Sequence, residues 1–196
     1  MNRLGSAVAL IAALLAGSCS AFTPRPDPSR FFTLTPITDA AAARGALSGR
    51  ILGIGPITFP RYLERPELVT RIGPNEVHNA AFDYWAGSLA KQFESTLAQN
   101  LQALLSPSSI VTFPWYTEPD GIVEIDVRQL ERGTDGQVHL VARWRVKKGR
   151  GSGVARAGES ALSRPASDDP GSTVAALSEL VGELSRELAE AVRAAA

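Results

Sequence analysis

The chain contains near the start of its globular part the stretch Gly53-Ile54-Gly55-Pro56-Ile57-Thr58-Phe59-Pro60-Arg61-Tyr62-Leu63-Glu64-Arg65-Pro66-Glu67-Leu68-Val69-Thr70-Arg71. The run that enters it, residues 50–57, is apolar on both faces, which is typical of a strand covered on both sides. Pro60 and Pro66 then interrupt the chain, and a second strand-like run begins at Leu68. The stretch therefore predicts a central strand, a rigid loop between two prolines, and a further strand.

The candidate functional residues lie in and just after this loop: Tyr62, Leu63, Arg65 and Arg71. In one interpretation the prolines fix a crossover, and Tyr62 and Leu63 enter the core. In the other, the four side chains form a contact with another subunit. Tyrosine and arginine are common at the energetic centres of interfaces, and a rigid loop loses little entropy on binding. The sequence leaves both interpretations open.

The composition is that of a globular domain. Of 196 residues, 20 are basic and 20 acidic, so the formal net charge is zero, and 44% are hydrophobic. This length suits one domain. A balanced charge argues against a general nucleic-acid partner, because such binding needs a basic surface that displaces counterions.

The first 18 residues have the pattern of a signal peptide. Arg3 supplies a positive charge, and residues 7–16 form an apolar run shorter than the roughly 20 residues that a membrane span needs. Cys19, the only cysteine, follows Ala16-Gly17-Ser18, and this tetrapeptide resembles a bacterial lipobox. The resemblance implies a lipid on Cys19. The alternative is an ordinary signal peptide whose cleavage leaves a free thiol.

We therefore divide the chain into a signal peptide (1–18), a lipidated cysteine with a proline-rich tether (19–30) and one domain (31–196). Prolines in the tether favour extended backbone. Ser20 follows Cys19, and an aspartate there would resemble an inner-membrane retention signal. By analogy we expect a lipid-anchored protein of the outer membrane that faces the periplasm.

Two long amphipathic helices are predicted. Residues 82–105 place apolar side chains three and four apart, with Trp85 near the start of the helix and Asp83 as a possible cap. The second helix begins at Asp169-Pro170, with aspartate as the cap and proline in the first turn.

Two segments that alternate apolar and polar residues, 121–130 and 137–147, predict an antiparallel hairpin with one wet face. On that face we expect acidic side chains opposite basic ones: Glu124 and Asp126 with Arg143 and Arg145.

Residues 31–36 and 154–163 are predicted as a first strand and an edge strand. Together the elements predict an α+β domain with a mostly antiparallel sheet and both long helices packed on one face. The basic turn at residues 147–150 is either a solvated hairpin tip or a contact for anionic headgroups.

No catalytic or metal-binding pattern is visible in the sequence. His78 and His139 have no cysteine or carboxylate at metal-ligand spacing. Gly53 and Gly55 are followed by Pro56 and not by a helix, so they are no dinucleotide-binding loop. These glycines allow close backbone approach in a strand instead. We expect no enzyme activity, no metal and no cofactor.

Three motifs of the opening stretch occur in order: Gly-x-Gly-Pro, Pro-x-Tyr-Leu-x-Arg-Pro and Val-Thr-Arg. They resemble the PqiC-type family, the auxiliary lipoproteins of MCE-type lipid-transport systems. Trp85, Asn100-Leu101 and residues 184–189 extend the resemblance over most of the mature chain. The loop-and-strand motif is its specific part.

The resemblance implies a non-enzymatic outer-membrane lipoprotein that is anchored through Cys19 and docks an MCE-domain partner of the same transport system. It also implies self-assembly into a ring. The alternative function is a monomeric periplasmic lipid carrier, which would need an apolar pocket of roughly 300–1,000 Å³.

Overall fold

The computed structural model describes residues 26–38, 47–149 and 153–195. Its elements are, in chain order, β1 (Arg30–Phe32), β2 (Ile51–Thr58), the 3-10 turn η2 (Arg61–Leu63), β3 (Glu67–Gly73), β4 (Glu76–Trp85), α2 (Leu89–Leu105), β5 (Ser109–Thr112), β6 (Gly121–Arg132), β7 (Gln137–Lys148), β8 (Val154–Pro165) and α3 (Pro170–Ala195).

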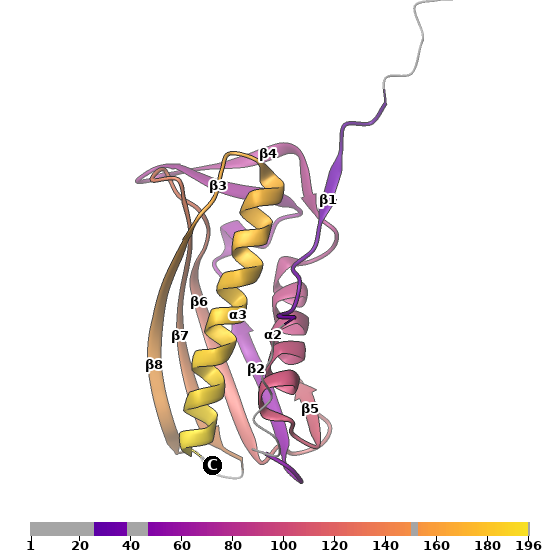
Figure 1. Cartoon of the computed structure of the whole chain (residues 1–196), viewed down its shortest axis with the longest axis vertical. Helices are drawn as coiled ribbons and strands as arrows, with labels where there is room; N and C mark the ends of the chain where they lie inside the picture. Colours follow the sequence, from indigo (N-terminus) through magenta and orange to yellow (C-terminus); the bar gives the residue numbers. More distant parts are fainter. Residues whose placement is uncertain (1–25, 39–46, 150–152, 196) are drawn as a thin grey trace, which may run out of the picture.

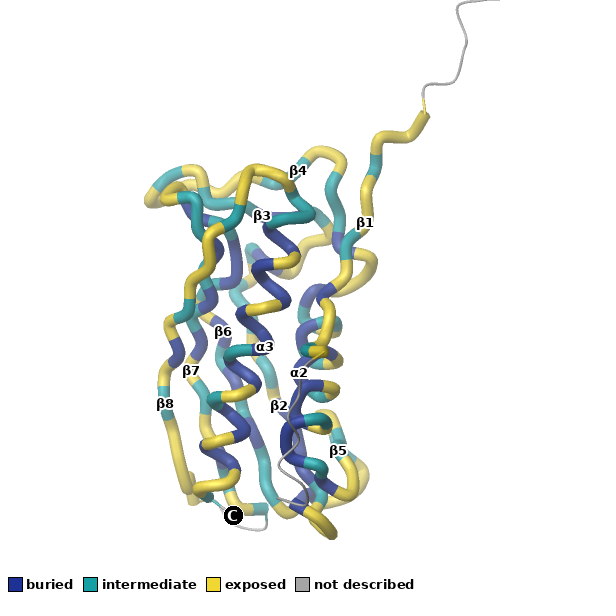
Figure 2. Tube along the Cα trace, viewed as in Figure 1, coloured by how far each residue is buried: buried dark blue, intermediate teal, exposed yellow. Residues whose placement is uncertain are grey.

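The fold is α+β, as the sequence predicts. Eight strands form one mixed sheet, and its longest ladders, β6–β7 and β7–β8, are antiparallel. The helices α2 and α3 lie side by side on one face of this sheet (Figure 1). α2 packs on β2 and β5, and α3 packs on β6, β7 and β8. The core lies between the helix pair and the sheet (Figure 2).

Strand β6 has two partners in line along the same side. β2 pairs in parallel with its first half, from Gly121 to Asp126, and β3 pairs in parallel with its last residue, where Thr70 lies opposite Arg132. Residues 59–66 fill the interval between β2 and β3. The predicted proline loop thus lies between two strands, β2 and β3, that pair with the same edge of β6.

The predicted start of the first helix, at residue 82, is wrong. Strand β4 continues to Trp85, and α2 begins only at Leu89. Tertiary pairing overrides the helical spacing: Trp85 N–H donates to Pro66 O over 2.7 Å, and the end of β4 pairs with β1. Asp83 binds Arg30 Nε at 2.7 Å and caps nothing. Gly87, at φ +144°, separates strand from helix.

The second helix begins as predicted. α3 starts at Pro170, and Asp169 Oδ2 accepts a hydrogen bond from Ser172 N over 3.0 Å. An acidic cap satisfies backbone N–H groups that have no partner within the helix.

The β6–β7 hairpin and the β8 edge strand are also confirmed. Glu124 lies opposite Arg145 and Asp126 opposite Arg143, as expected. Of these pairs, only Glu124–Arg145 is an ion pair, at 3.8 Å, because Arg143 turns to Glu159 on β8, at 2.7 Å.

The predicted first strand is shorter than residues 31–36, because the chain leaves the sheet after Phe32. Residues 33–38, here called the crossing segment, run over α2 and α3 instead. Leu34 N–H donates to Gln92 Oε1 at 3.0 Å, and Ile37 N–H donates to Asn100 Oδ1 at 2.9 Å. Both acceptors lie on α2, and Asn100 is fully buried.

The other helix holds the crossing segment too. Ser178 Oγ of α3 accepts a hydrogen bond from Thr35 N over 3.1 Å. A Cβ on Gly182 would lie 2.5 Å from Ile37 Cγ2, so only glycine leaves room for this side chain. Residues 39–46, which follow the crossing segment, lie outside the described part of the chain.

The glycines of β2 allow the close approach that the sequence predicts. A Cβ on Gly53 would lie 2.7 Å from Pro119 Cγ, and one on Gly55, at φ +110°, would lie 2.8 Å from Phe113 Cβ. The segment between β5 and β6 therefore crosses directly over the sheet face that the helices leave open.

We predict that Gly53→Val lowers the free energy of unfolding by about 1–3 kcal/mol, because the new side chain overpacks against Pro119. Urea denaturation measures this. Gly153→Val is the matched control, because a Cβ at Gly153 has no atom within 4 Å. Equal stability of the two variants would contradict the close approach.

Candidate functional site

The loop between Pro60 and Pro66 is a fixed turn. Pro60 is extended, at φ −60° and ψ 136°, and the 3-10 turn follows it. Leu63 N–H donates to Pro60 O over 2.9 Å, and Glu64 N–H donates to Arg61 O over 3.2 Å. These hydrogen bonds and the fixed φ of proline restrict the backbone before any side chain is considered.

The inner side of the loop belongs to the core. Leu63 is 2% exposed, so its side chain offers no contact area to a partner. Phe59, just before the loop, packs edge-on against Phe93 of α2, with ring centroids 5.3 Å apart. The first interpretation of the loop, in which Leu63 enters the core, describes this residue correctly.

Tyr62 and Arg71 meet at a carboxylate that sequence reasoning missed. Glu131 of β6 is fully buried. Its Oε1 accepts from Arg71 Nε at 3.0 Å and lies 3.0 Å from Arg71 Nη2. Its Oε2 accepts from Tyr62 OH and from Leu130 N–H, each at 3.0 Å. A buried carboxylate with this many donors is satisfied in its charged form.

A bulge in β6 turns Glu131 toward this site. The register shifts between Val127 and Gln129, so Leu130 faces the core and Glu131 faces the opposite side, where Arg71 lies. The sequence contains one indication of this bulge. Apolar residues occupy the odd-numbered positions Val123, Ile125 and Val127, whereas the next core residue, Leu130, has an even number.

The electrostatics keep Tyr62 neutral. Burial raises the pKa of Tyr62 to about 12, and the negative charge of Glu131 adds to this effect. The Arg71 guanidinium lies 6.0 Å from the centre of the Tyr62 ring and is 28% exposed. The three side chains therefore fix the position of the loop, with the Tyr62 hydroxyl protonated at neutral pH.

The outer side of the loop is charged, with the exposed Glu64 between two exposed arginines. Arg65 is 52% exposed, with its Nε 3.8 Å from Glu67 Oε2, and Arg61 is exposed as well. The structure thus brings Tyr62 and Arg71 together, buries Leu63 and leaves Arg65 apart on the surface. An interface role for these four residues stays a proposal.

The histidines do not converge. His78 is exposed on β4, and His139 Nε2 lies 2.9 Å from Asp135 Oδ2. In the ranges that the structure describes, no three His, Cys, Asp or Glu residues form a group able to hold a metal ion. Cys19, the expected lipid-attachment residue, lies outside these ranges.

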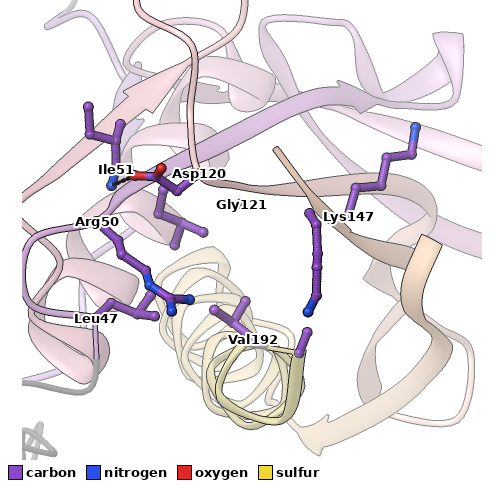
Figure 3. Close-up of a pocket in the computed structure, with 10 residues that line it drawn as sticks. Leu47, Arg50, Ile51, Asp120, Gly121, Lys147 and Val192 are labelled. Carbon is purple, nitrogen blue, oxygen red and sulfur yellow. Dashed lines mark hydrogen bonds between the residues drawn. The ribbon is translucent and has the colours of Figure 1, made fainter. Parts of the chain in front are cut away.

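A small cavity lies at the end of the domain where α3 ends. It has a volume of about 70 Å³, and its lining includes Leu47, Arg50, Leu52 and Val192 (Figure 3). Asp120 at its rim accepts a hydrogen bond from Ile51 N over 2.8 Å. This volume is well below that of ordinary ligand pockets.

We predict that Tyr62→Phe lowers the free energy of unfolding at neutral pH by about 1–2 kcal/mol, because it removes a hydrogen bond to a buried charge. Tyr84→Phe, whose hydroxyl bonds an exposed carbonyl, is the matched control and should have little effect.

The difference between wild type and Tyr62→Phe should also depend on pH. The folded state holds the Tyr62 proton more tightly than the unfolded state, so this stability is present below pH 10 and is lost as the pH rises towards 12. Urea denaturation of both proteins over this range measures it. A difference that stays constant would contradict the buried position of the hydroxyl.

Comparison with solved structures shows the same fold in other proteins. One crystal structure of an uncharacterized protein is 19% identical, with a TM-score of 0.69 over 84% of this chain and 98% of its own. A protein of Xanthomonas campestris from the family DUF330 is 16% identical, with a TM-score of 0.71 over 84% of this chain and 96% of its own. Comparison with the curated proteins found no match.

A family model also matches most of the chain. The model for the ABC-type transport auxiliary lipoprotein component matches residues 32–189, which include every strand from β2 to β8 and most of α3. No described helix has the length and hydropathy of a membrane span. The chain belongs to the family of ABC-type transport auxiliary lipoprotein components, the PqiC-type family that its loop-and-strand motif resembles.

Proposed function

We propose that this protein is a non-enzymatic outer-membrane subunit of an MCE-type lipid-transport system, anchored through Cys19 and docking the MCE-domain partner. The observation that carries the proposal is the family match over residues 32–189, which begins directly after the tether. The lipobox-like sequence before Cys19 supports the anchor, and Ser20 supports the outer membrane by analogy.

The attachment of the tether suits an anchored protein. β1 has only three residues and pairs with one edge of β4, so it alone would hold the tether weakly. The crossing segment adds hydrogen bonds from its backbone N–H groups to Gln92 and Asn100 of α2 and to Ser178 of α3. A pull on the tether is thus transmitted to both helices.

The outer side of the proline loop suits a protein contact. Leu63 in the core and Tyr62 on Glu131 hold the loop from inside, so docking on its outer side costs little ordering entropy. Arg61 and Arg65 face solvent there. We place the contact between subunits of a ring at this outer side, with Tyr62 and Arg71 as its support.

The alternative function, a monomeric lipid carrier, finds less support. Leu97, Leu101 and Leu184 are fully buried between the helices and the sheet, where a carrier would keep an open chamber. The cavity of about 70 Å³ beside Val192 is far below the size of a ligand pocket, and a larger hollow of about 490 Å³, beside Ile37 and Arg186, is an open groove with charged residues in its lining.

We predict that Cys19→Ser releases the protein from the membrane fraction, because the acyl anchor supplies the membrane affinity. Fractionation of cells that express the full chain, followed by a density gradient, measures this. Wild type should travel with the outer membrane. Retention of the Cys19→Ser protein in membranes would contradict the anchor, and wild type in the inner membrane would contradict the location.

We also predict that Arg61→Glu together with Arg65→Glu reduces the mass of the assembly, because both charges lie on the proposed contact. Native mass spectrometry of the mature protein compares the variants. Arg156→Glu, exposed on β8, is the control. The proposal fails if wild type is a monomer, or if the double variant keeps the wild-type mass.

A further inference from the structure

One exposed hairpin lacks the charges that an exposed hairpin normally carries. Residues 72–82, here called the hairpin segment, run from the end of β3 through the turn and along β4, and none of them is buried. Glu76 is their only charged residue. Ile72 is 49% exposed, Val77 36% and Phe82 52%. Apolar surface of this kind marks a contact with a protein or a membrane.

The apolar surface extends onto the neighbouring strand. Phe31 of β1 is 67% exposed and stacks on Tyr84, with ring centroids 5.7 Å apart. Val77 lies opposite Arg71 in the β3–β4 ladder, and Ile72 follows Arg71, so the two side chains are on opposite faces of the hairpin. The hairpin thus carries exposed apolar side chains on both faces, beside a polar turn at Pro74-Asn75, and this arrangement suits the boundary between headgroups and hydrocarbon better than a flat protein surface.

The ionic side chains around the hairpin segment are largely paired. Arg71 is bound to Glu131, and Asp168 lies 2.7 Å from Arg132. Arg30 bridges two further carboxylates, at 2.7 Å from Asp83 and 3.4 Å from Asp169; they are thereby neutralised in part. Pairing reduces the cost of bringing these charges to a low-dielectric boundary.

The position of the hairpin segment indicates what covers it. The β3–β4 hairpin lies at the same end of the molecule as β1 and the chain that leads to the tether (Figures 1 and 2). The tether from Cys19 to residue 30 has 12 residues, and the distance between its two ends is at most roughly 40 Å when it is extended. A lipid on Cys19 would therefore hold this end close to the membrane.

We propose that the hairpin segment inserts into the interfacial layer of the membrane that holds the lipid anchor. This inference rests on the proposed anchoring through Cys19. The anchor alone leaves the domain free to rotate on its tether, whereas a second, apolar contact fixes its long axis away from the bilayer. The end that carries β5 and the end of α3 then faces the periplasm (Figure 1).

The test measures membrane contact at single labelled positions in the full lipidated chain. Cys19 is the only cysteine, and its thiol is blocked once lipidated, so an introduced cysteine is the one site for a dye. We would label Val77→Cys with an environment-sensitive fluorophore and reconstitute the protein in vesicles of phosphatidylethanolamine and phosphatidylglycerol. Spin-labelled lipids then quench only a dye that lies in the bilayer.

Tyr116→Cys is the matched control, because Tyr116 is fully exposed and lies in the loop between β5 and β6, outside the hairpin segment. Quenching at position 77 but not at 116 is the expected result. Ile72→Ser with Phe82→Ser should weaken the quenching at 77, and circular dichroism confirms that each variant is folded.

The contrary outcomes are distinct. A dye at 77 that is not quenched, in protein whose mass shows the lipid on Cys19, overturns the membrane contact and leaves the proposed function standing. A dye that is shielded only as protein concentration rises assigns the hairpin segment to a second copy and also overturns it. Absence of the lipid on Cys19 overturns the proposed anchoring and this inference together.

Discussion

The fold depends on the pairing of β6 with two strands, β2 and then β3, one after the other along the same edge. β2 occupies its first half and β3 its end, so the chain between them must leave the row and return within eight residues. Glu131 lies at this join, fully buried. Its charge requires donors, and Arg71 from β3 and Tyr62 from the loop supply them. The carboxylate thereby fixes where the loop rests and where β3 enters. A misplaced loop would leave a buried charge without its partners, which is far more costly than the modest net gain of the pair.

The contacts with Glu131 divide the loop into an inner side, which packs in the domain, and an outer side, which faces solvent. Inside, Leu63 and Tyr62 are committed to the core and to Glu131, so their side chains explain a motif without any bound substrate. Outside, Arg65 is exposed and only loosely associated with Glu67. A sequence motif that identifies a family can therefore describe an internal joint, and the contact that we propose would use the residues on the outer surface of the loop.

The structural features that depend on residues close together in the chain were predicted from the sequence. The features that depend on contacts between distant residues were missed. The alternation of β6 and β7, the register of Glu124 opposite Arg145 and the cap at Asp169 all follow from local pattern. The start of α2 does not, because the strand pairing of β4 decides it and Trp85 bonds to Pro66. Glu131 was missed because a bulge changes which face it occupies. The crossing segment was missed because its acceptors, Gln92, Asn100 and Ser178, lie far away in sequence.

The crossing segment also explains why the helices carry polar residues inside an apolar interface. Asn100 is fully buried, and it accepts from Ile37 N and donates to Ser185 Oγ of α3 over 3.0 Å. Ser185 Oγ in turn donates to Val181 O over 2.6 Å, so the amide is satisfied at both ends. An apolar residue at 100 would leave the Ile37 N–H without its acceptor and weaken the attachment of the segment to α2, to which Gln92 also contributes. The buried amide of Asn100 therefore joins the crossing segment to α2 and, through Ser185, to α3 at once.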